Sequence, residues 1–251
     1  MKTTARKAER KDESLDSFYK GRILVLQKKR GYRFALDAPL LADFIRTKPG
    51  DEILELGAGN GIISLLLSLR PFRRITAVEI QPSLAGLARR NVRLNGFEDK
   101  VTVVRKDFRK YAPRKKFDIV YSNPPYIPRQ TGFLSSSREK SIAKHEIKCD
   151  ILDVMRKTAE LLQADGKAYF VYPAKRRADL MDAAGKYRLH LCALRFVHAR
   201  RREAPNLLLA EFRFGTGSVR SLRPLVLYDA GGGPTKEARR VFEGRIRGPA
   251  G

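Results

Sequence analysis

The stretch ILELGAGNGIISLLL, residues 53–67, decides the fold. Its first part is a short apolar run typical of a buried strand, and its last part has the apolar content of a buried helix. Three glycines, Gly57, Gly59 and Gly61, stand between the two. Glycine lets a ligand come close to the backbone where a strand ends and a helix begins. Many purely structural turns are also rich in glycine, so the neighbouring segments must decide whether this turn binds a ligand.

The segments after this turn alternate between short apolar runs and helical periods. Strands are expected at 51–56, 73–80, 100–107, 116–122 and 166–172, and helices at 60–69, 82–96, 149–166 and 174–186. Strands that alternate with helices predict an α/β fold with a doubly wound, mostly parallel sheet. Two further strands, at 187–199 and 204–215, have no helix between them and predict an antiparallel hairpin at one edge. The expected sheet therefore has seven strands.

Three segments lie outside this pattern. Residues 35–45 (ALDAPLLADFI) predict a helix with Asp37 as its N-cap and Pro39 in its first turn. Residues 22–34 (RILVLQKKRGYRF) predict two short strands around a basic turn. Near the C-terminus, residues 229–240 (DAGGGPTKEARR) predict a glycine-rich turn and a short charged helix, which either covers an edge or contacts RNA.

The composition favours a polyanionic partner. The net charge is +25, from 52 Lys and Arg against 27 Asp and Glu, and nucleic acid fits such a charge best. The basic residues expected to face it are Lys115, Lys116, Lys175, Arg176, Arg177, Arg200, Arg201 and Arg202. No apolar run reaches the ~18 residues of a membrane span. The N-terminus lacks the apolar core of a secretory signal, so a cytoplasmic location is expected. Two cysteines and three scattered histidines predict neither a disulfide framework nor a metal site.

Acidic residues at strand ends identify a cofactor site. Glu79 ends the second strand about 20 residues after the glycine turn, where an acid accepts hydrogen bonds from ribose hydroxyls. Asp107 follows the third strand, in reach of an adenine amino group. Glu55 introduces the turn; an acid there is unfavourable for a pyrophosphate but suits the cationic amino acid end of S-adenosylmethionine. These residues resemble the Rossmann-like, S-adenosylmethionine-dependent methyltransferases, and the seven-stranded sheet agrees with that family.

The tetrapeptide Asn123-Pro124-Pro125-Tyr126 follows the fourth strand, beside the expected cofactor. The Asn123 side-chain oxygen and the Pro124 carbonyl can accept both N–H groups of a planar amine and direct its lone pair toward the methyl group. Tyr126 offers a ring on which a flat base can stack. The candidate catalytic residues are therefore Asn123, Pro124 and Tyr126. The motif resembles that of amino-methyltransferases acting on adenine N6, guanine N2 or glutamine amide nitrogen, and it does not choose among them.

Three further segments resemble one methyltransferase family more specifically. Residues 26–44 (LQKKRGYRFALDAPLLADF), 143–151 (AKHEIKCDI) and 223–242 (RPLVLYDAGGGPTKEARRVF) are similar to the bacterial tRNA1(Val) (adenine(37)-N6)-methyltransferases, and the likeness covers roughly residues 18–242. The chain departs from that family at Lys144, where arginine commonly precedes the pair His145-Glu146. Lysine keeps the positive charge of arginine but cannot form its bidentate hydrogen bonds to a phosphate, which leaves the role of this segment open.

The resemblance implies an enzyme that methylates the exocyclic N6 amine of an adenine in tRNA, with S-adenosylmethionine as cofactor, tRNA as partner and a monomeric chain. The residues implied for cofactor binding are Asp37, Glu55, Gly57, Gly59, Asn60, Glu79, Ile80, Asp107, Phe108 and Asn123. For Asp37, a plain helix-capping role is equally good. The implied organisation is a basic flexible tail over 1–14, a methyltransferase domain over 15–228 with a pre-sheet segment over 18–50, and a charged extension over 229–251.

Three alternatives remain open at this point. A protein glutamine N5-methyltransferase shares the tetrapeptide but usually carries a separate helical domain before the sheet. An rRNA guanine-N2 methyltransferase is permitted by the same motif. A catalytically silent RNA-binding module on this scaffold is a non-enzymatic alternative, against which the intact Glu55, Glu79, Asp107 and Asn123 argue.

Overall fold

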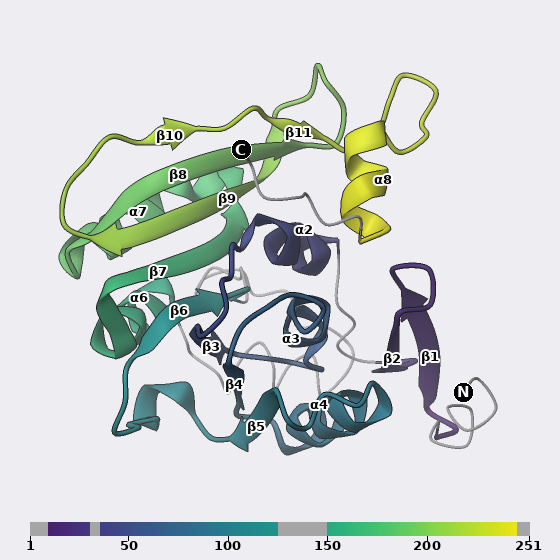
Figure 1. Cartoon of the computed structure of the whole chain (residues 1–251). Coiled ribbons are helices and arrows are strands. Elements are labelled where there is room, and N and C mark those ends of the chain that lie inside the picture. The colour runs from purple at the N-terminus through teal and green to yellow at the C-terminus, as the bar shows by residue number, and fades with distance from the viewer. Residues whose placement is uncertain (1–9, 31–35, 125–149, 245–251) are drawn as a thin grey trace.

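A mixed β-sheet forms the centre of the computed structural model, which describes residues 10–30, 36–124 and 150–244 (Figure 1). The strand order is β10-β8-β9-β7-β6-β3-β4-β5, and β11 also pairs with β8. The strands are β3 (Glu52–Leu56), β4 (Arg74–Glu79), β5 (Val101–Arg105), β6 (Phe117–Ser122), β7 (Leu162–Pro173), β8 (Leu189–His198), β9 (Pro205–Phe214), β10 (Arg220–Ser221) and β11 (Leu225–Val226). Only β9 runs against its neighbours, pairing antiparallel with β7 and β8. The predicted mostly parallel sheet with an antiparallel hairpin is confirmed, and the two short strands β10 and β11 extend it beyond the prediction.

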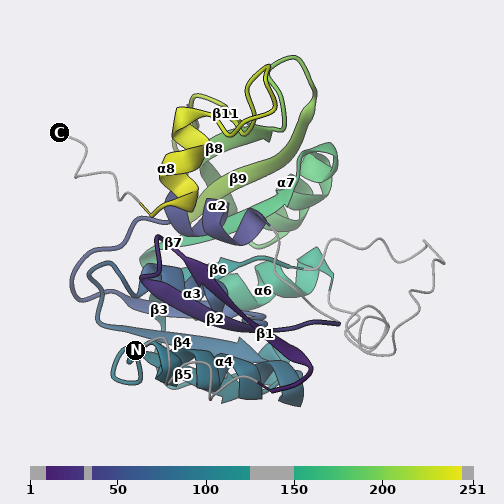
Figure 2. The ribbon, with the colours of Figure 1, turned by 90° about the vertical axis from the view of Figure 1, so that its right-hand side faces the viewer.

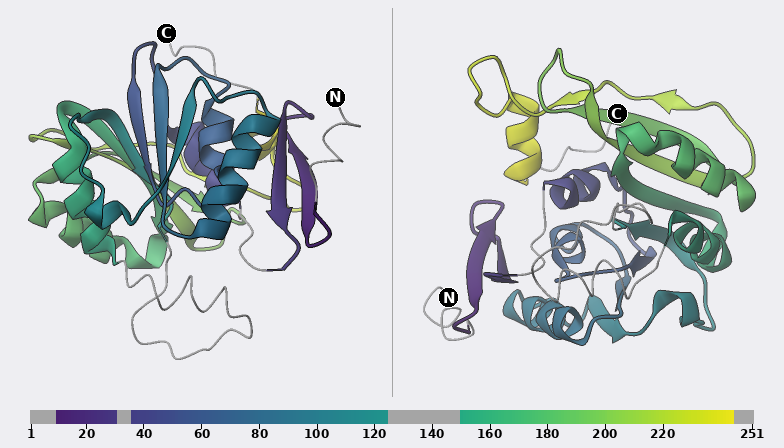
Figure 3. Two further views of the ribbon diagram at one scale, coloured as in Figure 1. Left: turned by 90° about the horizontal axis from the view of Figure 1, so that it is seen from below. Right: turned by 180° about the vertical axis from the view of Figure 1, so that it is seen from behind.

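Helices cover both faces of this sheet. They are α2 (Asp37–Phe44), α3 (Ile62–Leu67), α4 (Pro82–Leu94), α6 (Ile151–Leu161), α7 (Arg177–Lys186) and α8 (Lys236–Phe242), with short 3₁₀ turns η1 (Phe108–Lys110) and η2 (Ala174–Arg176). One apolar core includes Leu40 and Leu65 from α2 and α3, and the other includes Met155 and Leu180 from α6 and α7. Figure 3 shows the strands between these two layers. None of the helices in the described residues combines the length and apolarity that crossing a membrane requires.

Two predicted boundaries were wrong. Helix α6 ends at Leu161 and not at Gly166, because Leu162 already pairs with Phe117 of β6 and is fully buried in the sheet. The leucines at this point satisfy a helical and an extended pattern equally well. Asp37 is the first residue of α2 and not its N-cap; the N-cap is Leu36, and the Asp37 carboxylate accepts from the Ala38 N–H at 3.0 Å.

The N-terminal region forms a separate two-stranded sheet, β1 (Glu13–Phe18) and β2 (Ile23–Lys28). Of the two strands predicted around a basic turn in 22–34, the first is confirmed as β2, and residues 31–34 of the second lie outside the described residues. Strand β2 pairs with β1, which lies upstream of it and was not predicted. Gly21 takes a φ of 85° in the turn between the two strands. The first strand begins at Glu13, inside the segment expected to be a tail. The sequence did not predict it, because the polar residues of β1 carry little strand signal. This hairpin lies beside α4 (Figure 1 and Figure 2).

Helix α8 packs against α2 and β11. Thr235 caps the helix by accepting from the Ala238 N–H at 3.1 Å, and Ala238 and Val241 are buried. Arg195 of β8, itself almost fully buried, donates to the Glu237 carboxylate at 2.6 Å. Of the two roles that the sequence left open for this segment, covering the core is therefore supported by its packing.

Candidate cofactor and acceptor site

The predicted site residues follow four neighbouring parallel strands. The registers of β3 with β6 and with β4 place Gly57, Asn123 and Glu79 at the same level, one or two steps beyond the last paired residues. Asp107 follows β5, which pairs with β4. Adjacent strands lie about 4.8 Å apart, so the residues that continue them are close neighbours. The structure thus brings the start of the tetrapeptide beside the glycine turn, at the carboxyl edge of the sheet.

The glycine turn is tightly closed. The N–H groups of Gly57 and Ala58 both donate to the Val78 carbonyl, at 2.9 and 3.0 Å. Gly57 has a φ of 77°, and a Cβ atom there would meet no atom of the described residues within 4 Å, so these residues leave the space beside it open. Gly61 has a φ of 83°, and a Cβ atom there would lie 3.3 Å from the Ala88 Cβ of α4. Glycine is needed at residue 57 for the positive φ of its backbone. At residue 61 it is needed for the positive φ and also for close packing against α4.

Glu79 lines the turn from β4. Its Oε2 accepts from the Gly59 N–H at 2.8 Å, and its Oε1 accepts from the Gln81 N–H at 2.8 Å. The side chain is almost fully buried, and this burial raises the pKa of its carboxyl. A carboxylate has about four acceptor positions, so both oxygens can still accept from ligand hydroxyls.

Glu55 is buried more deeply than its predicted role suggests. Its residue is 2% exposed, and its carboxylate accepts from the Ser64 hydroxyl, which lies 3.0 Å from the Tyr121 hydroxyl. Burial raises the pKa of this carboxyl to about 8. The acid therefore sits under the turn, between β3, α3 and β6, and holds a proton at neutral pH when no cation lies beside it.

Asn60 adds an unsatisfied donor to the turn. Its residue is 1% exposed, its carbonyl accepts from the Asn91 side chain at 2.9 Å, and its Oδ1 accepts from the Ile62 N–H at 3.4 Å. Its Nδ2 has no hydrogen-bond partner within the described part of the chain. Buried donors of this kind are rare in native proteins and call for a partner, such as a bound ligand or water.

Asp107 forms an ion pair with Arg109, a residue that was not among the predicted site residues. The Arg109 guanidinium grips its carboxylate, with Nε 3.0 Å from both oxygens and Nη2 2.7 Å from Oδ2. These hydrogen bonds lower the pKa of the Asp107 carboxyl. Phe108 beside it packs on the α6–α7 core, and Ile80 directly follows Glu79 and is half-buried. The residues expected around an adenine thus lie together, with Arg109 as an additional member.

The acceptor tetrapeptide is only partly described. Asn123 is half-buried and Pro124 is buried, and the Ser122 hydroxyl before them donates to the Leu56 carbonyl at 2.7 Å, which ties the end of β6 to β3. Tyr126 lies outside the described residues, as does the segment of Lys144, His145 and Glu146. Asp37 is the first residue of α2, and the chain between β2 and α2 lies outside the described residues.

The structure divides the predicted basic surface into two groups. Lys175, Arg176 and Arg177 follow β7, and residues 200–202 form the β8–β9 turn, so both segments lie at the carboxyl edge with Asn123. Lys115 and Lys116 precede β6 and lie at the opposite edge, where Lys115 pairs with Glu52 at 2.7 Å. One part of the expected surface is therefore on the wrong side of the sheet from the tetrapeptide.

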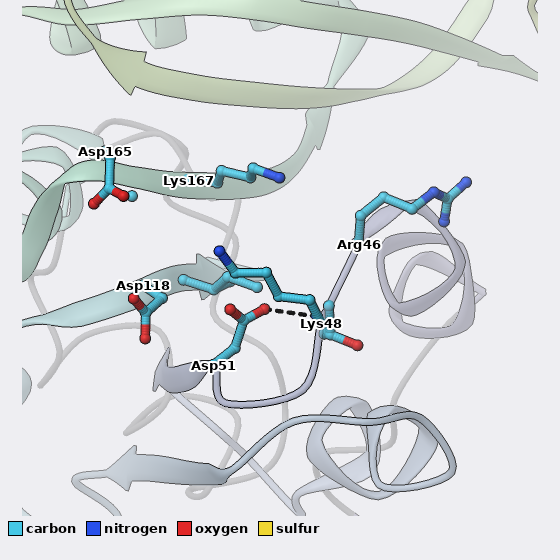
Figure 4. Close-up of a pocket in the computed structure, with 9 residues that line it drawn as sticks. Arg46, Lys48, Asp51, Asp118, Asp165 and Lys167 are labelled. Carbon is cyan, nitrogen blue, oxygen red and sulfur yellow. Dashed lines mark hydrogen bonds between the residues drawn. The ribbon is translucent and has the colours of Figure 1, made fainter. Parts of the chain in front are cut away.

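A small cavity of about 100 Å³ lies at that opposite edge. Figure 4 shows the Asp118 and Asp165 carboxylates on one side of it and Arg46 on the other. The Asp51 carboxylate accepts from the Lys48 N–H at 2.8 Å, and burial raises its pKa. The cavity belongs to the beginnings of the strands and takes no part in the site at their ends. Among the described residues, no group of His, Cys, Asp and Glu is arranged to hold a metal ion.

Sequence reasoning missed two asparagines, Asn91 of α4 and Asn95 at the C-cap of this helix. Asn91 and Asn95 lie on the buried side of this amphipathic helix and hydrogen-bond the backbone of β2. The helical period could have identified them, because the apolar positions of Leu84 and Ala88 predict that Asn91 and Asn95 lie on the same apolar face of the helix. Polar amides on an apolar stripe indicate specific hydrogen bonds.

Comparisons with known proteins agree with this geometry. Residues 33–181 match the family described as "Methyltransferase small domain". The tRNA1(Val) (adenine(37)-N6)-methyltransferase of Phocaeicola vulgatus is 30% identical over 71% of this chain and 75% of its own, and that of Bacteroides thetaiotaomicron is 29% identical over 76% and 80%.

Solved structures share the fold. A predicted O-methyltransferase from Agrobacterium tumefaciens superposes with a TM-score of 0.67 at 22% identity, over 84% of this chain and 97% of its own. The Methanocaldococcus jannaschii tRNA m1G37 methyltransferase has a TM-score of 0.58 at 16% identity, over 83% and 59%. The resemblance inferred from the sequence is thus confirmed: the chain belongs to the methyltransferase small domain family, in the branch of the tRNA1(Val) (adenine(37)-N6)-methyltransferases.

Proposed function

We propose that this chain transfers a methyl group from S-adenosylmethionine to the exocyclic N6 amine of an adenine in tRNA, and that this adenine is A37 of a valine tRNA. Family membership makes the chain a methyltransferase and implies S-adenosylmethionine as the donor. The names of the relatives support the choice of adenine and of tRNA. The single observation that carries the proposal is the register that puts Asn123 level with Gly57.

The residues of the glycine turn fit such a donor. The open space beside Gly57, the Asn60 Nδ2, which has no partner among the described residues, and the spare acceptor capacity of Glu79 are all features that a ligand would use. We assign Glu79 to the ribose hydroxyls, and Ile80, Asp107 and Phe108 to the adenine end, with Arg109 holding the Asp107 carboxylate in place.

The amino acid end of the donor is assigned to Gly59, Asn60, Glu55 and Asp37. A positive charge beside Glu55 favours its ionised form, which burial otherwise disfavours. When bound, S-adenosylmethionine supplies an electrophilic methyl group on a sulfonium.

Asn123 and Pro124 are assigned to the acceptor amine. The Asn123 amide oxygen and the Pro124 carbonyl accept one N–H each, which turns the nitrogen lone pair toward the donor and favours the tetrahedral nitrogen of the transition state. Tyr126 is assigned to stacking on the base, worth about 1–3 kcal/mol. No base is needed before transfer, because the amine becomes acidic once it is methylated, and alignment supplies much of the rate.

The carboxyl edge of the sheet is proposed as the tRNA surface. Lys175 and Arg177 are exposed there, as is the turn of Arg200, Arg201 and Arg202. The basic end of β2, residues 28–30, adds charge on the other side of the glycine turn. An anticodon-loop base is already partly unstacked, so its extrusion into the site costs only a few kcal/mol. All of these residues come from one chain, and we propose that it acts as a monomer, in the cytoplasm.

One experiment tests the reaction. Purified protein is incubated with labelled S-adenosylmethionine and unmodified tRNA, and the tRNA is digested to nucleosides. We expect label in N6-methyladenosine from valine tRNA. Label in N2-methylguanosine would overturn the assignment of the base. In a parallel incubation with protein in place of tRNA, label in a glutamine would overturn the assignment of tRNA as the substrate. Binding of tRNA without any transfer would favour the silent module.

The variant Asn123→Ala supplies the control for mechanism. The resemblance implies Asn123 for cofactor binding as well, but its assigned role is to accept from the acceptor amine. Transfer should therefore fall by at least about 100-fold while the donor dissociation constant changes less than about threefold. Calorimetric titration with S-adenosylmethionine measures the second quantity. Near-normal turnover in this variant would remove Asn123 from the mechanism.

A further inference from the structure

Helix α4 holds the N-terminal hairpin through two side-chain amides. Asn95 accepts from the Leu24 N–H at 2.8 Å and donates to the Leu24 carbonyl at 2.7 Å. Asn91 accepts from the Leu26 N–H at 2.7 Å and donates to the Leu26 carbonyl at 3.1 Å. The two asparagines are one helical turn apart and the two leucines are two residues apart on β2, so the amides satisfy this edge of the strand as a neighbouring strand would.

Asn91 differs from Asn95 in one contact. Its Nδ2 also donates to the carbonyl of Asn60 in the glycine turn, at 2.9 Å, whereas the Asn95 Nδ2 donates to the Asn91 carbonyl within α4. Asn91 is fully buried, so both of its donor hydrogens and its oxygen are used inside the protein. A single amide therefore bridges the hairpin and the turn, and neither can move without stretching its hydrogen bonds to it.

The hairpin is held to α4 at a second point. Glu13 of β1 and Arg90 of α4 form a bidentate pair, with N–O distances of 2.5 and 2.7 Å, and the Glu13 side chain is almost fully buried. This pair lowers the pKa of the Glu13 carboxyl. Strand β2, which Asn91 contacts at Leu26, ends at Lys28 and is followed by Lys29 and Arg30. The contacts thus run from the glycine turn through Asn91 to a basic segment.

We propose that Asn91 is a positioning residue that couples the cofactor turn to the N-terminal hairpin, so that donor binding at the turn and ordering of the hairpin favour each other. The proposal rests on the proposed function in one respect, namely that S-adenosylmethionine occupies the turn. By thermodynamic linkage, the binding free energy that the donor gains when the hairpin is ordered equals the stabilisation that the hairpin gains when the donor is bound. Asn91 touches neither substrate and acts through the Asn60 carbonyl.

The matched variants Asn91→Leu and Asn95→Leu test this coupling. Each removes two hydrogen bonds to the β2 backbone, so both should lower the melting temperature by similar amounts. Only Asn91→Leu removes the contact with Asn60. We expect it to weaken binding of S-adenosylmethionine about tenfold, the effect of one to two hydrogen bonds. Asn95→Leu should bind S-adenosylmethionine within about twofold of the original chain.

Hydrogen exchange on the unchanged chain gives a second measurement that needs no variant. Saturating S-adenosylmethionine should slow exchange of the Leu26 amide at least about threefold, and should leave the amide of Leu194 in β8 unchanged. In Asn91→Leu the slowing at Leu26 should be lost. If Asn91→Leu fails to fold, the exchange result on the unchanged chain decides.

The outcomes separate the two proposals. If the unchanged chain does not bind S-adenosylmethionine, the proposed function fails. If it binds, but the two variants have equal affinities or the Leu26 amide does not respond, the coupling is wrong and the proposed function stands.

Discussion

Glu55 illustrates how one residue changes meaning between sequence and structure. In the sequence it is an acid beside a glycine turn, which suits a cationic ligand. In the structure its carboxylate is buried under the turn and hydrogen-bonded to Ser64, and its pKa is raised to about 8. Its charge at neutral pH therefore depends on what binds above it.

The raised pKa of Glu55 predicts a pH dependence of stability. Between pH 4.5 and about 8 the folded protein holds this proton and the unfolded chain releases it, so this group's contribution to the free energy of unfolding falls as pH rises through that window. Each pKa unit corresponds to about 1.4 kcal/mol, which makes the total a few kcal/mol. Denaturant unfolding at pH 5, 7 and 9 measures the slope. The free energy of unfolding of Glu55→Gln should vary less with pH than that of the original chain. An equal variation with pH in the two proteins would contradict the prediction.

Glu79 leads to a prediction about binding. Its carboxylate is held by two backbone N–H groups in an orientation that can still accept from ribose hydroxyls. Hydrogen bonds to a charged group contribute about 1.5–3 kcal/mol, so Glu79→Ala should weaken donor binding by about 10- to 100-fold. Glu52→Ala, at the opposite edge of the sheet, serves as the control and should leave the dissociation constant unchanged. An unaltered constant in Glu79→Ala would remove the ribose assignment.

At the scale of elements, the parallel strands and their helices were predictable, because each apolar run is long enough to mark a buried strand. The boundaries were less predictable. Leu161 and Leu162 fit a helix and a strand alike, and only the pairing of Leu162 with Phe117 shows that the strand begins there. Strand β1 was not predicted, for a related reason. Strand β1 is short and polar. The Glu13–Arg90 pair holds β1, and the amides of Asn91 and Asn95 hold β2, so the position of the hairpin is set by residues that are distant in sequence.

At the scale of the whole molecule, the sheet separates the basic residues into two edges. Arg201 and Arg202 are exposed on the β8–β9 turn, and within the described ranges neither forms an ion pair. Lys115 and Lys116 are equally exposed but lie at the other edge. The position of a strand end therefore decides which charges face a ligand bound near Asn123.

This arrangement predicts different effects of two double variants on tRNA binding. Arg201→Ala with Arg202→Ala should weaken binding and reduce the steepness of the log–log salt dependence by about 1.5, as expected for the loss of two phosphate contacts. Lys115→Ala with Lys116→Ala removes the same charge from the opposite edge and should change the slope by less than about 0.5. Binding titrations at several salt concentrations measure both slopes. Equal effects would show that net charge, and not its location, governs binding.

The sequence by itself determined the fold class, the glycine turn, the acid after the second strand and the tetrapeptide after the fourth, because each depends on local backbone chemistry or on the length of an apolar run. Tertiary structure alone decided that Glu55 is buried, that Arg109 holds Asp107, that Asn91 bridges the hairpin and the turn, and on which edge each basic cluster lies. These features depend on contacts between residues far apart in the chain, and hydrophobic periodicity carries no information about such contacts.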